Sequence, residues 1–190
     1  GGLPLRILHH GRNAGQSAAL RTGIAAARSA WVATLDGDAQ NDPADIPRLL
    51  DLVAREGAPA DLRLVCGWRR RRADTWSKRV ASRVANGVRS RVLGDATPDT
   101  GCGLKLIHRA TFLELPFFDH LHRFLPALVA AAGGRVVSVE VKHRPRTRGR
   151  SKYGLADRLW VGLFDLFGVL WLRHRTRPCV ADEIRTVVPS

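Results

Sequence analysis

Two aspartates at D-x-D spacing, Asp36 and Asp38, stand in the acidic segment LDGDAQNDP. They follow residues 31–35, an apolar run whose length and β-branched content predict a buried strand. Carboxylates at the end of such a strand lie where open α/β sheets bind their ligands. Two carboxylates in one turn can bind one divalent cation, and Gln40 adds a neutral oxygen two positions later. One interpretation of the spacing is therefore an Mg²⁺ or Mn²⁺ site, with Asp36, Asp38 and Gln40 as candidate ligands.

A second interpretation of the same segment is structural. Asp42 precedes Pro43 and an amphipathic pattern that includes Ile46 and Leu49, which is typical of a helix that begins with an aspartate cap. A D-x-D pair in a polar strand-to-helix turn of this kind needs no metal. The spacing leaves both interpretations open.

The elements that must position these residues alternate along the chain. Short apolar runs predict strands, and longer amphipathic or alanine-rich runs predict helices. Alternation of this kind predicts an α/β fold with a mainly parallel sheet and helices on both faces. The expected strands are 5–9, 31–35, 62–66, 103–107 and 135–143, and the expected helices are 16–30, 41–53, 72–93, 122–132 and 155–173.

Charge and composition limit the function classes. The 190 residues carry a formal net charge of +14, and residues 63–91 hold ten lysines and arginines against one acid. A basic surface beside an acidic site indicates an anionic partner, namely nucleic acid, anionic lipid or a phosphorylated substrate. The three cysteines (Cys66, Cys102 and Cys179) lack metal-binding spacing, which favours a reducing compartment. We find neither a signal-peptide pattern nor an apolar run of the ~20 residues that a membrane span needs.

The motifs taken together resemble family-two glycosyltransferases, with the dolichol-phosphate mannose synthases and bacterial polyprenyl-phosphate sugar transferases as the most similar groups. The resemblance begins with N-x-G at Asn13 and Gly15, followed by a helix of small residues and then D-x-D-x-Q-N-D-P. It continues through VCGWRRRR, SKRVASRVAN, DTGCGLKLIHR, HRFLPAL and RTRGRSKYG. It therefore covers nearly the whole chain in the order of the family.

This resemblance implies a glycosyltransferase A-type α/β/α sandwich, with a partial catalytic domain over residues 1–154 and a helix and tail over 155–190. The implied reaction transfers a sugar, with inversion, from a nucleotide-sugar to undecaprenyl or dolichyl phosphate. Asp38 and Gln40 would hold Mg²⁺ or Mn²⁺, and Asp36 would contact the metal and the donor. The implied donor-binding and catalytic residues are Asn13, Gly15, Asp36, Asp38 and Asp99.

The resemblance also implies an acceptor-phosphate site in the basic segments. Its residues would be Arg69, Arg79, Ser82, Arg146 and Lys152, the last two in a loop that closes over the phosphates. Without the resemblance, the basic run that includes Arg69 is more typical of a solvated face than of a nucleic-acid patch. Asp99 would either position the acceptor or stabilise the fold, and His122 would touch the sugar or pack in the core.

The final expected helix carries Trp160 and Trp171 near its ends and arginines after it. Such a pattern is typical of a helix in the lipid headgroup region, and also of a core or oligomer-interface helix. We expect a peripheral protein on the cytoplasmic face of a membrane, with a nucleotide-sugar, a polyprenyl phosphate and the membrane surface as partners. Self-association into a homo-oligomer is also expected, and specific nucleic-acid binding is not.

The opening motifs of the family, a V-x-I-P-type strand and D-D-G-S, do not occur. The resemblance therefore implies that the first strands are lacking, which would expose a sheet edge and favour self-association. The alternative functions are a transferase acting on a polysaccharide or other non-lipid acceptor, a nucleic-acid-binding module, and a truncated inactive remnant.

Overall fold

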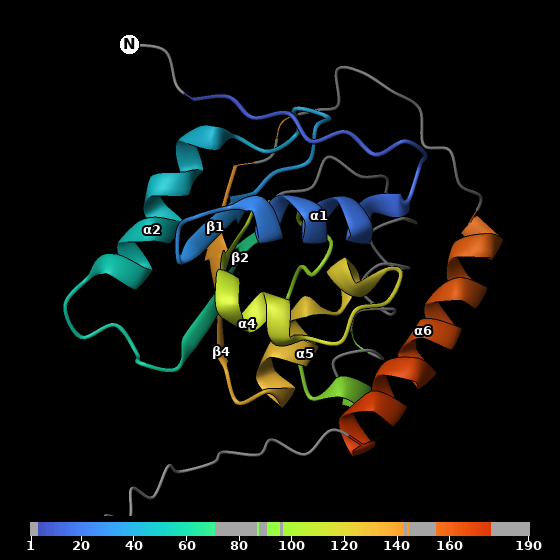
Figure 1. The fold of residues 1–190 in the computed structure, drawn as a ribbon. Helices are drawn as coiled ribbons and strands as arrows, with labels where there is room; N and C mark the ends of the chain where they lie inside the picture. Colours follow the sequence, from blue (N-terminus) through green and yellow to red (C-terminus); the bar gives the residue numbers. More distant parts are fainter. Residues whose placement is uncertain are drawn as a thin grey trace, which may run out of the picture.

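The computed structural model describes residues 4–70, 87, 91–95, 97–142, 144 and 155–175, with only the backbone for residues 155–161 and 163. The order of elements is strand and helix in alternation around one sheet (Figure 1). The strands are β1 (Trp31–Thr34), β2 (Leu62–Trp68), β3 (Lys105–His108) and β4 (Arg135–Glu140). The α-helices are α1 (Gly15–Ala26), α2 (Ile46–Ala54), α4 (Arg109–Glu114), α5 (Leu125–Ala131) and α6 (Leu155–Arg175), and short 3₁₀ turns cover Pro43–Asp45 and Leu121–Arg123.

The four described strands form one mixed sheet in the order β1-β3-β2-β4. Strand β3 pairs antiparallel with both β1 and β2, whereas β2 and β4 are parallel. Strands β1, β2 and β4 therefore run in one direction and β3 alone runs against them, so the expected mainly parallel sheet is confirmed, with one reversed strand. The alternation of strands and helices did not reveal that β3 returns between β1 and β2 in the opposite direction.

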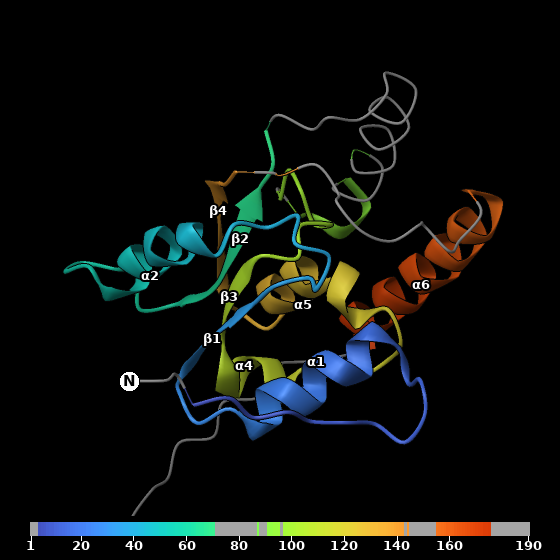
Figure 2. The same cartoon turned by 90° about the horizontal axis from the view of Figure 1, so that it is seen from above.

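Helices cover both faces of this sheet, which confirms the expected sandwich. Figures 1 and 2 show α2 on one side and α1, α4, α5 and α6 on the other. The side chains of β2 alternate accordingly: Val65 packs with Leu49 of α2, and Leu64 packs with Phe112 of α4 and Val129 of α5. Such alternation is what buries both faces of a strand in a three-layer fold.

The segment 5–9 is not a strand. Leu5 and Ile7 are 82% and 81% exposed, and the segment runs beside α1 (Figure 2). The Arg6 guanidinium donates to the Ala26 carbonyl, and a ring nitrogen of His10 lies 2.9 Å from the Thr22 hydroxyl. A β-branched apolar run forms a strand only where a neighbouring strand accepts its hydrogen bonds. Here the segment bonds to a helix instead.

Most other expected elements are confirmed, with small shifts at their ends. Asp42 caps the turn that leads into α2, because its carboxylate accepts a hydrogen bond from Ala44 N at 3.1 Å and Pro43 follows at the first position. Helix α4 was not expected, since its six residues are too few for a clear periodicity. The expected helix 72–93 lies almost entirely outside the described residues.

Helix α6 packs on the core through one face and presents apolar residues on another. Val169 is buried, and the Asp165 carboxylate lies 2.9 Å from His120 Nδ1. Phe164, Phe167 and Trp171 are 74%, 68% and 61% exposed. No helix among the described residues combines the length and hydropathy needed to cross a bilayer. The boundary expected at residue 154 stays a prediction, although Val169 shares its core with α4 and α5.

Candidate active site at the end of strand β1

The D-x-D segment follows β1 as a tight, hydrogen-bonded loop. The Asp36 carboxylate accepts a hydrogen bond from Gln16 Nε2 of α1 at 3.1 Å. The Asp38 carboxylate accepts one from the backbone N–H of Gln40 at 3.2 Å, and Ala39 between them adopts a left-handed conformation with φ 60°. An aspartate that bonds to the backbone two residues later forms a turn of this kind locally. The loop therefore holds both carboxylates in defined positions.

A glycine sits directly against Asp36. A Cβ atom at Gly103 would lie 2.2 Å from Asp36 Oδ2 and 2.3 Å from Asp36 Cγ. The Thr34 hydroxyl donates to the Gly103 carbonyl at 2.8 Å, which joins the end of β1 to the turn before β3. Only a residue without a side chain leaves Asp36 in this position.

Both carboxylates line one open cavity of about 950 Å³. Its walls come from the end of β1, from α1, from the turn 100–103 and from the segment before α5. Lys105, His122 and Arg123 line the same cavity, and its inner end is apolar, with Ile24 and Phe112 among its walls. A concave site of this size with a few convergent polar groups is typical of a ligand site.

The oxygen ligands here suit a hard divalent cation. Asp36 and Asp38 supply carboxylates to the same cavity, and Mg²⁺ commonly takes one or two carboxylates together with substrate phosphates. Among the described residues no group of three His, Cys, Asp or Glu side chains gathers around one point. A cation here would therefore depend on ligands from the substrate. Gln40 is not among the lining residues, so its role as a ligand stays a prediction.

Asn13 and Gly15 shape the start of α1. The Asn13 side-chain oxygen accepts a hydrogen bond from Gly15 N at 3.0 Å, and Gly15 has φ 81°. Neither residue lines the cavity, whereas Gln16, the next residue, bonds to Asp36. The donor-binding role expected for Asn13 and Gly15 stays a prediction. The observed contacts show that they form the turn that precedes Gln16.

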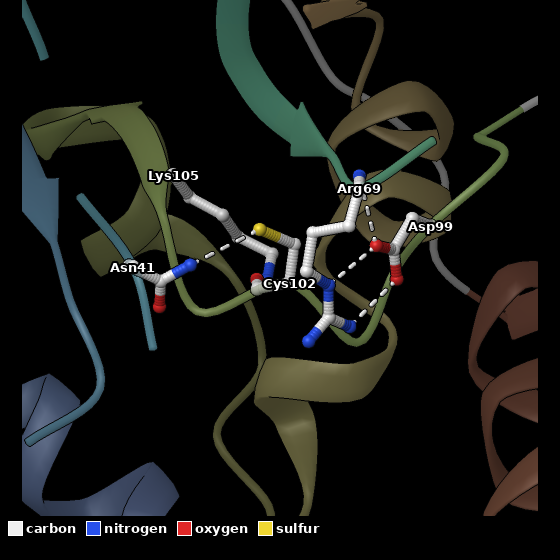
Figure 3. Close-up of polar contacts among 5 residues, drawn as sticks. All are labelled: Asn41, Arg69, Asp99, Cys102 and Lys105. Carbon is white, nitrogen blue, oxygen red and sulfur yellow. Dashed lines mark hydrogen bonds and ion pairs between the residues drawn. The ribbon is translucent and has the colours of Figure 1, made fainter. Parts of the chain in front are cut away.

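Arg69 is held by Asp99 rather than projecting into solvent (Figure 3). Its Nε donates to Asp99 Oδ2 at 2.7 Å, its Nη2 to Oδ1 at 3.0 Å, and its backbone N–H to Oδ2 at 3.2 Å. Burial opposes the charge of Arg69, but the hydrogen bonds that it donates to Asp99 and the negative charge of this carboxylate outweigh burial and raise the pKa of the guanidinium. The other terminal nitrogen points away from Asp99 (Figure 3), so one edge of the guanidinium faces elsewhere. Asp99 therefore positions Arg69.

We expect Arg69→Ala to destabilise the fold strongly. Asp99 is 3% exposed, and removing the guanidinium that bonds to a buried carboxylate costs up to roughly 3–5 kcal/mol. Urea unfolding should show this loss, and adding Asp99→Asn should recover part of it, because a neutral amide costs less to bury. Arg70→Ala is the control, since its 3.6 Å ion pair with Glu140 joins side chains that are 66% and 49% exposed and is worth about 1 kcal/mol or less. An Arg69→Ala variant as stable as Arg70→Ala would contradict the prediction.

The remaining residues expected in the acceptor site, Arg79, Ser82, Arg146 and Lys152, lie outside the described residues. The segment that leads to the last two is attached to the D-x-D loop. Arg144 donates to the Asp42 carboxylate at 2.6 Å and through its backbone to the Gln40 carbonyl at 3.0 Å. Lys142 N donates to the buried Asp45 carboxylate at 2.7 Å. These contacts join the end of β4 to the loop that carries Asp38.

His122 lies in the wall of the candidate site, and the sequence did not reveal which residues it contacts there. Its Nδ1 lies 3.0 Å from the hydroxyl of Ser17, a buried residue of α1, and its ring lines the cavity. Burial, together with the nearby positive charges of Arg123 and Lys105, lowers the pKa of His122 to about 4. The imidazole is therefore neutral at physiological pH, and either hydrogen-bonding sense with Ser17 is open to it.

This pKa predicts an acid-sensitive fold. Between pH 6.5 and 4 the folded protein binds fewer protons at His122 than the unfolded chain does, so stability falls as the pH falls. The loss reaches up to about 2 kcal/mol at pH 5. Thermal unfolding at pH 7 and pH 5 should show a smaller drop for His122→Gln than for the unsubstituted protein. His174→Gln, which removes an exposed histidine of α6, should leave the drop unchanged. Equal drops in all three proteins would refute the prediction.

Comparison with known proteins agrees with this geometry. Residues 1–115 match the family model described as glycosyl transferase family 2. The chain is 38% identical over 181 residues to a dodecaprenyl-phosphate galacturonate synthase of Rhizobium johnstonii, which covers 93% of this chain and 52% of that protein. It is 35% identical over 144 residues to an undecaprenyl-phosphate 4-deoxy-4-formamido-L-arabinose transferase of Edwardsiella ictaluri, covering 76% of this chain and 43% of that protein. The chain thus spans about half the length of these curated relatives.

Solved structures share the fold. A crystal structure of glucosyl-3-phosphoglycerate synthase from Mycobacterium tuberculosis, with Mn²⁺, uridine-diphosphate and phosphoglyceric acid, matches with a TM-score of 0.59 at 19% identity. The match covers 92% of this chain and 57% of that one. A second crystal structure of the same synthase, with Mn²⁺, UDP-glucose and glycerol 3-phosphate, matches with a TM-score of 0.55 at 20% identity over 90% of this chain and 56% of that one. These matches show the fold, and the family model and the curated relatives show that the chain belongs to glycosyl transferase family 2.

Proposed function

We propose that the protein is a glycosyltransferase that moves a sugar from a nucleotide-sugar to a polyprenyl phosphate, inverting the anomeric centre. The observation that carries the proposal is the convergence of Asp36 and Asp38 on one cavity at the end of β1. The names of the relatives support the substrate class, because both act with a polyprenyl phosphate. Because one of these relatives is a galacturonate synthase, a nucleotide-linked uronic acid is one of the donors to test.

The residues of the chain divide the work between donor and acceptor. Asp36 and Asp38 would hold Mg²⁺ or Mn²⁺, which stabilises negative charge on a leaving diphosphate when bound. Gln16 and Gly103 fix the position of Asp36. Arg69, oriented by Asp99, would bind the acceptor phosphate with its other edge, together with Arg79, Ser82, Arg146 and Lys152. A phosphate monoester is already an anionic nucleophile, so the chain needs no strong general base, and Asp99 serves to hold Arg69.

A transfer assay tests the proposal. The protein would be incubated with Mn²⁺, undecaprenyl phosphate and UDP-glucose or UDP-galacturonate. We expect a lipid-linked sugar product with at least one donor, detected by mass spectrometry. Undecaprenol, which lacks the phosphate, is the matched control and should yield none. Transfer to a polysaccharide but not to the lipid phosphate would favour the alternative acceptor, and absence of any product would contradict the proposal.

We also propose that the protein works on the cytoplasmic face of a membrane, with α6 against the lipid. Phe164, Phe167 and Trp171 form an outward apolar stripe, and Arg173, His174 and Arg175 follow in the last turn. Aromatic residues beside cations are typical of helices at the headgroup level. Flotation with anionic vesicles should be lost when the three aromatics are changed to Ser, and kept when the exposed Leu50 of α2 is changed to Ser. Self-association and the lack of specific nucleic-acid binding stay predictions.

A further inference from the structure

Lys105 is a buried cation that neither the metal site nor the acceptor site uses. It stands in β3, in the middle of the sheet, and is 6% exposed. Its Nζ donates to the Cys102 carbonyl at the turn before the strand (Figure 3). An ammonium has three donors, and the Cys102 carbonyl accepts from one of them.

A buried ammonium is costly, since removal from water is compensated only by hydrogen bonds or an opposite charge. Packing does not explain the lysine. Its neighbours Leu104 and Leu106 point into the core beside α2, whereas Lys105 lies on the opposite face and lines the same cavity as Asp36 and Asp38. The apolar Ile107, two residues later on that face, is fully buried. An aliphatic side chain at position 105 would therefore pack equally well against this face of the sheet.

The charges around the cavity favour an anion beside Lys105. A divalent cation on Asp36 and Asp38 would balance those two carboxylates. Lys105 and Arg123 would then remain as positive groups in the cavity wall, next to His122, which is neutral at physiological pH. A nucleotide-sugar brings negative charge into such a cavity in its diphosphate, and a uronic acid donor brings a carboxylate on the sugar as well.

We propose that the Lys105 ammonium binds an anionic oxygen of the donor, from either the diphosphate or a carboxylate on the sugar. The inference rests on the proposed function, because it takes the cavity to be the donor site. Lys105 thereby becomes a residue of the donor site. A lysine that only closed the turn at Cys102 would affect stability and leave donor binding unchanged.

The experiment measures binding of three probes by calorimetry in the presence of Mn²⁺: UDP, UDP-glucose and UDP-galacturonate. Lys105→Gln removes the charge but keeps an N–H donor for the Cys102 carbonyl, and Lys105→Met removes both. Lys142→Met is the matched control, because it removes one positive charge from an exposed residue whose hydrogen bond to Asp45 is made by the backbone N–H. Thermal unfolding of each variant shows whether the turn persists.

We expect Lys105→Gln to weaken binding about ten- to a hundredfold, as for loss of one charge-assisted hydrogen bond, with Lys142→Met unchanged. Equal weakening for all three probes assigns the lysine to the diphosphate, and weakening confined to UDP-galacturonate assigns it to a sugar carboxylate. If the Lys105→Gln variant binds every probe with the same affinity as the Lys142→Met variant, the inference is overturned and the proposed function stays intact. Absence of any Mn²⁺-dependent binding by the unsubstituted protein overturns the donor site and the inference with it.

Discussion

Replacing Asp38 with Asn is expected to abolish Mn²⁺-dependent binding of UDP while leaving the fold intact. Asn keeps a side-chain oxygen that can accept the hydrogen bond from Gln40 N, so the turn persists. It loses the negative charge that a hard divalent cation requires, and the described residues offer no third carboxylate, Cys or His ligand at the same point to replace it. We expect roughly a hundredfold weaker binding or more, by calorimetry with UDP and Mn²⁺.

The matched control is Asp51→Asn, which removes one carboxylate from an exposed position on α2. It should bind UDP and Mn²⁺ as the unsubstituted protein does, and both variants should unfold at nearly the same temperature. Metal-dependent binding that survives in Asp38→Asn would remove Asp38 from the metal site. It would also favour the interpretation of the segment as a capped turn.

Gly103→Ala is expected to damage the same site through Asp36 without touching any substrate. The added methyl group would stand 2.2 Å from Asp36 Oδ2, a separation that no pair of such atoms tolerates. The carboxylate is the end of a half-buried side chain, so it can swing away at modest cost to stability. Asp36 would then lose the position that Gln16 and Gly103 define. We expect metal-dependent binding of UDP to fall roughly ten- to a hundredfold, as for other residues that orient a ligand.

Gly37→Ala separates this effect from the general cost of adding a methyl group to the loop. Gly37 lies beside Asp36 in the sequence, and a Cβ there would meet nothing within 4 Å. We expect Gly37→Ala to bind normally and Gly103→Ala to bind poorly, with similar melting temperatures for the two. A Gly103→Ala variant that binds as well as Gly37→Ala would show that Asp36 does not depend on this close contact. An unfolded Gly103→Ala variant would show that Asp36 cannot move away at modest cost to stability.

Local features of the sequence predicted most of the helices and strands that position the site. The start of α2 depends on Asp42 and Pro43, which are neighbours, and the strand before the D-x-D segment depends on residues 31–35 alone. Hydrogen bonds and side-chain periodicity within a few residues determine such elements. The motif set was also sufficient to recognise the family, because family motifs are themselves local patterns in a fixed order.

Only the tertiary structure decided which distant residues meet. Arg69 and Asp99 are 30 positions apart, Ser17 and His122 are 105 apart, and Gly103 reaches Asp36 across the β1–β3 pairing. The direction of β3 and the failure of segment 5–9 to form a strand also depended on partners far along the chain. Strand pairing and the burial of a cation such as Lys105 are decided by neighbours that sequence spacing does not specify. The acidic pair was therefore visible in the sequence, whereas the residues that hold it and complete its cavity became visible only when β1, β3 and α1 were brought together.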